Sequence, residues 1–234
     1  MTSLLRIALA AALAAGMAFA ACAQENKQEN KQENKQDQKD AAKEAEAAKE
    51  AAAAKDAVVF AGRLFAGRLE NDKSYACFVR NYDAAHLAGH PLQKVKAMKL
   101  LVTAERDEES KVLGYSFRLG VRFVSRPGDF DSSGSCSMLS AEHREQEKTK
   151  AQVGCGVDCD GGGISIELTK ENKSTLVRLE RIRIWKNNKP EEEGLDLSGG
   201  ADDKIFRLDR AKLEQCRSLV HDRKELAAIR TLKQ

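Results

Sequence analysis

The cysteines are the side chains of this chain that are best suited to chemistry. Five of the six, Cys77, Cys136, Cys155, Cys159 and Cys216, lie beyond the N-terminal region, and two of these belong to the stretch VGCGVDCDGGG at 153–163. Cysteines can ligate metals, form redox centres or form structural disulfides. Zinc needs four ligands, and no second Cys/His pair stands at the usual spacing; a redox pair would be CxxC. The spacing therefore favours disulfides.

The hairpin around EHREQEKTK predicts which cysteines pair. Counted from its centre, Cys136 and Cys155 lie ten and nine residues away, so they should be almost opposite each other on two strands. Opposed residues of this kind are close enough for a disulfide. We predict the pairs Cys136–Cys155 and Cys159–Cys216, the second joining a C-terminal helix to a loop. Cys77 is then left as a free thiol, a small buried residue or an alternative to Cys159.

Two other patterns imitate metal sites. His86 and His90 form HxxxH, the spacing of two ligands on one helix face, but Asp83 is a typical N-cap and a proline ends this short helix before His90. GDFDSSGS at 128–135 resembles the front half of a calcium loop, although Ser140 stands where such a loop needs a glutamate. We interpret both as turns and predict no metal and no cofactor.

Motifs of known catalytic geometry are missing from the sequence. There is no GxSxG, no glycine-rich phosphate loop and no HExxH. His143 and His221 have no evident serine or cysteine partner, and Asp158 and Asp160 lie in a loop without a visible supporting residue. Because catalysis needs positioned groups with shifted pKa values, the sequence favours a protein that is not an enzyme, with a dispersed active site as the alternative.

A set of arginines is the remaining candidate for binding. Arg118, Arg122, Arg181 and Arg183 occupy outward positions on expected strands. If those strands are neighbours, the arginines form a basic stripe that could meet an anionic envelope polymer or a lipid headgroup. Glutamates interspersed on the same strands weaken this field, so an ordinary solvated face is the alternative.

Composition limits the partners. The chain has 39 Lys and Arg against 36 Asp and Glu residues, with a formal net charge of +3. This intermixed, near-neutral balance lacks the basic footprint of a nucleic-acid binder. Beyond the N-terminus no segment approaches the roughly 20 apolar residues of a membrane helix. Membrane contact is therefore expected only through an N-terminal lipid anchor.

The N-terminus is typical of an exported protein. Residues 1–23 combine an early arginine, a short apolar run and small residues, as a secretory signal peptide does. FAAC at 19–22 resembles the bacterial lipoprotein box, with phenylalanine in place of the usual leucine. Cys22 is therefore a candidate for lipidation, and ordinary cleavage after small residues is the alternative. We predict export to the periplasm, where disulfides form.

A tether and one domain follow the signal peptide. Within 24–57, QENKQENKQENKQDQK has no apolar residue and predicts disorder, whereas DAAKEAEAAKEAAAAKDA predicts a semi-rigid helix. Residues 58–234 carry the aromatic residues and the β-branched runs, and their length suits one globular domain.

Period-two alternation dominates residues 58–234. YSFRLGVRF at 115–123 and GISIELTK at 163–170 alternate apolar and polar residues, as half-buried antiparallel strands do. Between 174 and 186 the apolar positions change phase, which predicts a β-bulge near Glu180–Arg181. Residues 210–232 have helical spacing. We predict an all-β antiparallel meander, closed as an up-and-down barrel of about eight strands, with a C-terminal helix; a two-sheet sandwich is the alternative.

Three functional hypotheses follow. The first is an exported, non-catalytic envelope protein whose tethered β-domain binds a ligand or partner in the periplasm, and a basic or apolar concave pocket would favour it. The second is a small barrel-type inhibitor of a cell-wall hydrolase, which a protruding, disulfide-framed loop would favour. The third is a cryptic hydrolase, which would need converging acids with raised pKa values.

Overall fold

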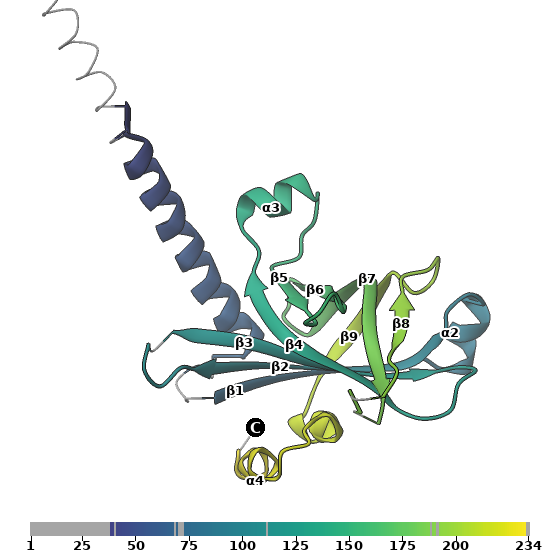
Figure 1. The fold of residues 1–234 in the computed structure, drawn as a ribbon. Helices are drawn as coiled ribbons and strands as arrows, with labels where there is room; N and C mark the ends of the chain where they lie inside the picture. The colour runs from purple at the N-terminus through teal and green to yellow at the C-terminus, as the bar shows by residue number, and fades with distance from the viewer. Residues whose placement is uncertain are drawn as a thin grey trace, which may run out of the picture. The chain divides into compact units, whose positions relative to one another are not determined.

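The computed structural model describes residues 38–39, 41–67, 69, 73–110, 112–187, 189–190 and 192–232. The predicted signal peptide, Cys22 and the QENK repeats lie outside these residues. The chain divides into two compact units, Met1–Ala54 and Lys55–Gln234. In the first unit, residues 41–54 are helical and exposed. The second unit is the β-rich domain (Figure 1).

Within the described residues, the β-rich domain has nine antiparallel strands in one sheet. The strands are β1 Lys73–Asn81, β2 Val95–Arg106, β3 Leu113–Phe123, β4 Phe130–Met138, β5 Val153–Gly156, β6 Gly162–Leu168, β7 Ser174–Lys186, β8 Leu195–Ser198 and β9 Ile205–Ala211. Eight of them close a ring, in the order β1 to β7 and then β9, which pairs with both β7 and β1. β8 adds to the second half of β7. The predicted eight-stranded up-and-down barrel is confirmed.

Alternation along the strands sorts side chains between the barrel interior and the surface. On β3, Phe117, Leu119 and Val121 are at most 2% exposed, whereas Ser116 and Arg122 are exposed. The inward residues of all nine strands belong to one apolar cluster. The interior of the barrel is therefore a packed core, and the outward positions are left for binding surfaces.

A helical segment at 55–64 adds to this core, which the sequence pattern did not predict. Phe60, Leu64 and Phe65 are at most 4% exposed, and Phe65 stacks on Tyr115 of β3 with ring centroids 6.3 Å apart. Arg210 of β9 donates to the Leu64 carbonyl oxygen at 2.8 Å. A cation at the C-terminal end of a helix satisfies carbonyls that have no partner inside the helix.

β7 contains the bulge that its sequence predicts. Ile164 of β6 pairs with Leu179, and the residue before Ile164 pairs with Arg181. Glu180 is therefore an extra residue that has no partner on β6. In a regular strand, residues 179 and 182 would face opposite sides. The extra residue allows both Leu179 and Ile182 to face the core, where each is at most 1% exposed.

The C-terminal segment packs on the outside of the barrel, in two pieces instead of the single helix predicted. The 3-10 helix η1 spans Leu213–Leu219 and the α-helix α4 spans Arg223–Thr231. Their apolar residues form a second cluster with outward Leu101 of β2. The break occurs because Asp222 begins a new helix: its carboxylate accepts a hydrogen bond from the Glu225 backbone N–H at 2.7 Å.

The disulfides agree only in part with the predicted pairs. Cys136 of β4 and Cys155 of β5 lie directly opposite each other and are bonded, as predicted. Cys216 is bonded to Cys77 instead of Cys159, and Cys159 is a free, exposed thiol. Strand alternation explains the correction. Cys77 points outward from β1 into the cluster formed with η1, whereas Cys159 lies in the turn between β5 and β6.

Two short helices lie in the connections between strands. They are α2, Ala84–Gly89, and α3, Ala141–Gln146. Asp83 caps α2, as predicted, by accepting a hydrogen bond from the His86 N–H at 2.8 Å. Ser140 caps α3 in the same way, at 3.1 Å. No helix among the described residues is long and apolar enough to cross a membrane.

Alkylation of the folded, unreduced protein tests the cysteine pairing. We expect iodoacetamide to modify the peptide that contains Cys159, because this thiol is exposed and unpaired. The peptides of the four bonded cysteines should react only after reduction and unfolding. Peptide mapping by mass spectrometry measures both, and Cys159→Ser should remove the modification from that peptide. Modification of Cys77 or Cys216 without reduction would show that the pairing is wrong.

Candidate functional site

The arginines predicted to form a basic stripe lie on β3 and β7, which both pair with β4. Their charges are opposed by acidic neighbours. Arg181 and Arg183 share Asp196, with distances of 3.2 and 3.5 Å to Oδ1. Arg122 lies 4.0 Å from Asp129. Anion binding by this stripe stays a prediction. The ion pairs with Asp196 and Asp129 weaken the positive potential that anion binding would need.

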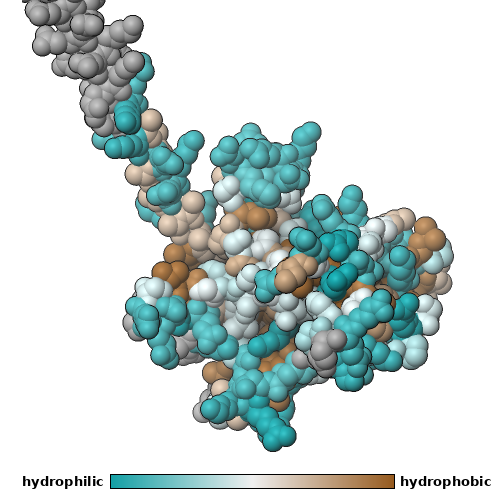
Figure 2. Space-filling view, in the orientation of Figure 1, coloured by the Kyte–Doolittle hydropathy of each residue, from teal (hydrophilic) through white to brown (hydrophobic). Residues whose placement is uncertain are grey.

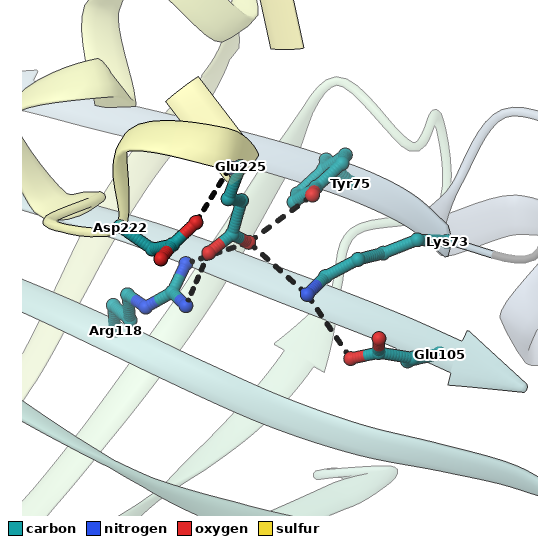
Figure 3. A network of polar contacts seen from close by, with 6 residues as sticks. All are labelled: Lys73, Tyr75, Glu105, Arg118, Asp222 and Glu225. Atoms are coloured by element: carbon teal, nitrogen blue, oxygen red, sulfur yellow. Dashed lines mark hydrogen bonds and ion pairs between the residues drawn. The ribbon is translucent and has the colours of Figure 1, made fainter. Parts of the chain in front are cut away.

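Glu225 of α4 is the centre of a polar network on the outer face of the barrel (Figure 3). Its carboxylate accepts two hydrogen bonds from Arg118 of β3, at 3.1 and 2.8 Å, and one from the Tyr75 hydroxyl of β1 at 3.1 Å. Lys73 Nζ lies 3.3 Å from the same carboxylate and 3.0 Å from Glu105. We call this network, which joins α4 to the first three strands, the clamp.

The electrostatics of the clamp favour a structural role over acid–base chemistry. Burial by itself raises the pKa of the Glu225 carboxyl, but the hydrogen bond and charge of Arg118, together with Lys73, outweigh burial and lower this pKa. Burial and the nearby Glu225 charge raise the pKa of the Tyr75 hydroxyl. At neutral pH Glu225 is therefore an anion and Tyr75 a neutral donor, and they satisfy each other.

A projecting connection frames a concave surface on another part of the barrel. This connection, which we call the arm, comprises residues 139–152, joins β4 to β5, contains α3 and stands away from the barrel (Figure 1). The Cys136–Cys155 disulfide crosses its base. The Leu139 N–H donates to the Gln152 carbonyl at 2.9 Å. Both ends of the arm are therefore held together.

The space beside the arm, which we call the groove, has a volume of about 890 Å³. One wall is the arm, which contributes His143 and other residues. The floor is the outer face of β5 and β6, and β7 and the start of β9 form the other wall. The outward floor positions are all small: Gly154, Gly156, Gly163 and Ser165.

Glycine keeps the floor of the groove low at two positions. A Cβ atom at Gly156 would meet nothing nearer than the Gly162 carbonyl oxygen at 4.0 Å, so this position opens into the groove. A Cβ atom at Gly154 would come within 2.9 Å of Leu139 Cδ2. Glycine at 154 therefore lets the arm lie against the strand, and the bare floor allows another backbone to approach closely.

The surroundings of the groove are polar and carry both charges. Ser133, Ser135 and Ser137 are exposed along the outer face of β4. Arg178, on one wall, pairs with Glu167 at 3.0 Å. Figure 2 shows a strongly hydrophilic arm above a paler barrel surface. The remaining charged residues of the walls are Glu147, Lys148, Glu180, Arg181 and Lys204. This balance suits reversible contact with a mixed-charge partner better than attraction of a polyanion.

The residues that imitate metal sites have other partners. The rings of His86 and His90 stack with centroids 4.1 Å apart. His86 Nε2 lies 3.0 Å from Gln93 Oε1, and His90 Nδ1 lies 2.8 Å from the His86 carbonyl oxygen. The GDFDSSGS segment is mostly strand and not the predicted turn, because β4 begins at Phe130, whose side chain faces the core. In the part of the chain that the structure describes, no group of three or more His, Cys, Asp or Glu residues could hold a metal ion.

Sequence reasoning missed both the clamp and the groove. Glu225 is 150 residues from Tyr75 and 107 from Arg118, so no local pattern connects them. A pattern in the sequence could have indicated the groove: glycine or serine recurs at alternate positions in 133–137 and 154–156. Among the histidines noted from the sequence, His143 lines the groove and His221 lies between η1 and α4.

Glu225→Gln tests the clamp. We expect the free energy of unfolding to fall by about 1–3 kcal/mol near pH ~7, because the partly buried Arg118 loses its anionic partner. Folding lowers the Glu225 pKa, so its stabilisation is complete above the unfolded-state pKa and is lost as the pH falls through the folded-state value. Urea unfolding should therefore show a smaller difference from wild type near pH ~3.

Glu171→Gln is the matched control for this substitution. The Glu171 side chain is 74% exposed and lies 3.0 Å from Lys173 Nζ. We expect this variant to unfold almost as wild type does at both pH values. Equal losses in the two variants, or a Glu225→Gln loss that does not change with pH, would contradict the role of the clamp.

Comparison with known proteins does not identify a function for this chain. No protein-family model, curated protein or solved structure matches the chain. The barrel, the clamp and the groove are therefore the observations from which its function is inferred.

Proposed function

We propose that the β-rich domain is a non-catalytic binding module of an exported envelope protein, and that it holds an extended segment of a partner polypeptide in the groove. The observation that carries this proposal is the groove itself, about 890 Å³ between the arm and a floor of small residues. Its volume is within the range of ligand-binding clefts. The disulfide at the base of the arm holds one wall in place before binding, which lowers the ordering cost of association.

The lining of the groove supports a polypeptide as the occupant. Gly156 and its neighbours leave space for a main chain to lie against the strands. Charges of both signs on the walls match a segment that carries both acidic and basic side chains. The groove-lining residues that the structure describes include no Phe, Tyr or Trp. A ligand with flat aromatic rings would therefore have no aromatic side chain to stack on.

Export and anchoring are part of the same proposal. The two disulfides of the described domain agree with an oxidising compartment, and the signal-like segment 1–23 supports the periplasm as that compartment. We place Cys22 as the residue that would carry a lipid anchor. The helix at 41–54 would then act as a spacer between the anchor and the binding domain.

Filling the groove at one position tests the proposal. Gly156→Leu should weaken binding of the partner by about tenfold or more, because the new side chain occupies the floor that the partner contacts. The substitution has room for its Cβ atom, so thermal unfolding should stay close to wild type. Immobilised wild-type and variant domains, exposed to envelope extract and then to the purified captured protein, measure the affinity.

Gly114→Leu is the control for the filling variant. Gly114 is also an exposed strand glycine, and its Cβ atom would meet only the Glu105 carbonyl oxygen at 3.7 Å, an ordinary contact. Binding should survive this substitution. If Gly114→Leu and Gly156→Leu weaken binding equally, or if neither does, the groove is not the binding surface.

Inhibition of a cell-wall hydrolase is the second candidate function. The observation that favours it is the arm, a projecting connection whose base is crossed by the Cys136–Cys155 disulfide. A rigid projection can enter the cleft of an enzyme with little loss of conformational entropy. The hydrolase hypothesis has less support. The described carboxyl groups with a resolved shift, Asp107, Asp209 and Glu225, have lowered pKa values, whereas a general acid needs a raised one.

Cell-wall digestion distinguishes the two candidates. If the arm inhibits a hydrolase, the domain should slow the release of soluble fragments from purified peptidoglycan by lysozyme-type or amidase-type enzymes. Replacing Arg144 and Glu145 at the arm, both outside the groove lining, by alanine should relieve this inhibition, while Gly156→Leu should not. Digestion at the same rate with and without the domain would exclude inhibition of the enzymes used.

A further inference from the structure

The bulge in β7 places two successive charged side chains in one wall of the groove. Glu180 and Arg181 are both exposed and both line the groove, whereas Leu179 and Ile182 on either side of them are buried in the core. In a regular strand, one of two successive residues would point into the barrel. Bulges that redirect a side chain in this way are common beside functional sites. The bulge thus adds an outward charged residue to the wall.

Glycines on both neighbouring chains fix the backbone of the bulge. A Cβ atom at Gly162 of β6 would collide with the Arg181 carbonyl oxygen. A Cβ atom at Gly199, which follows β8, would collide with the Leu179 carbonyl oxygen. Glycine therefore allows both chains to lie close against the bulge. The Gly199 N–H also donates to the Glu180 carbonyl oxygen at 2.7 Å. The backbone of Glu180 is thus held in place before any partner arrives.

The two arginines close to Glu180 on the same strand already have anionic partners. Arg178 lies 3.0 Å from Glu167, and Arg181 lies 3.2 Å from Asp196. Among the described residues, by contrast, no cation forms an ion pair with the Glu180 carboxylate. The negative charge of Glu180 is therefore available to an occupant of the groove.

Lys204, in the same wall, carries a charge of the opposite sign. Its carbonyl oxygen accepts a hydrogen bond from the Leu179 N–H at 2.9 Å, so the two segments are neighbours. In the described part of this wall, however, the Lys204 and Glu180 side chains form no ion pair with each other. The lysine has the longer and more flexible side chain. Glu180, on the fixed bulge, is therefore better placed to discriminate between partners.

We propose that Glu180 is a specificity-determining residue of the groove, and that it selects partner segments that carry a lysine or arginine where they cross β7. This inference rests on the proposed function of the groove and adds the kind of residue that the partner must have. A basic side chain forms a charge-assisted hydrogen bond with the carboxylate. An acidic side chain at the same place is repelled, which supplies the discrimination.

Selection of random short peptides, displayed on phage, on the immobilised whole protein tests the preference. Peptides recovered on wild type should share a position that is occupied by lysine or arginine. Glu180→Lys should instead recover peptides with aspartate or glutamate at the shared position, because the charge of the wall is reversed. Gly156→Leu, which fills the floor of the groove, should recover few of the wild-type peptides.

Affinities of one selected peptide then locate its basic residue. In wild type, replacing that residue of the peptide by glutamine should weaken binding by about fivefold. In Glu180→Gln the same replacement should cost less than about twofold, because the carboxylate that it met is gone. Glu171→Gln, a matched variant at an exposed turn, should behave as wild type. Urea unfolding checks that each variant is folded.

The outcomes separate this inference from the proposal on which it rests. Suppose that peptides bind wild type and are lost in Gly156→Leu. The role of Glu180 is then wrong if they share no basic position, or if replacing the basic residue costs the same in wild type and Glu180→Gln, while the groove stays the binding surface. If no peptide binds wild type, or if binding survives Gly156→Leu, the proposed function of the groove is wrong and this inference with it.

Discussion

Closure of the sheet by β9 is the constraint on which the rest of the domain depends. β9 pairs with β7 at five positions and with β1 at three, so neither strand presents an open edge along these stretches. Closure directs the inward side chains of the ring into one core. The same strand supplies Arg210, whose guanidinium binds the carbonyl end of the helical segment at 55–64 and lies 4.7 Å above the centre of the Phe78 ring. One strand thus completes the ring and holds the helix that packs into it.

A filled barrel leaves only its outer surface for binding, and two structural anchors shape that surface. The Cys136–Cys155 disulfide holds the base of the arm beside the groove. The Cys77–Cys216 disulfide and the Glu225 clamp hold the C-terminal segment against β1, β2 and β3. In both places glycine on a strand makes room for an overlying segment: Gly154 for the arm and Gly120 for Leu219 of the C-terminal segment. The concave surfaces therefore come from added segments on a regular sheet.

How far a feature could be predicted depended on the sequence distance between its parts. The Cys136–Cys155 pair spans 19 residues of one hairpin, where counting from the turn is sufficient. The bulge at Glu180 was visible as a change of phase within one strand. Cys77–Cys216 spans 139 residues, and either Cys77 or Cys159 could have reached Cys216 on local grounds. Only the side of β1 on which η1 packs decides between them.

By itself, the sequence determined the all-β class, the faces of the strands and the local hairpin disulfide, because alternation and turn spacing act between near neighbours. The tertiary structure alone decided that residues 55–64 join the core, that Arg118 meets Glu225, and that the groove exists. Each of these depends on segments brought together by ring closure, and small outward residues acquire a use only when another segment lies over them. The physical reason is that side-chain periodicity records which face is buried, but not what covers the other face.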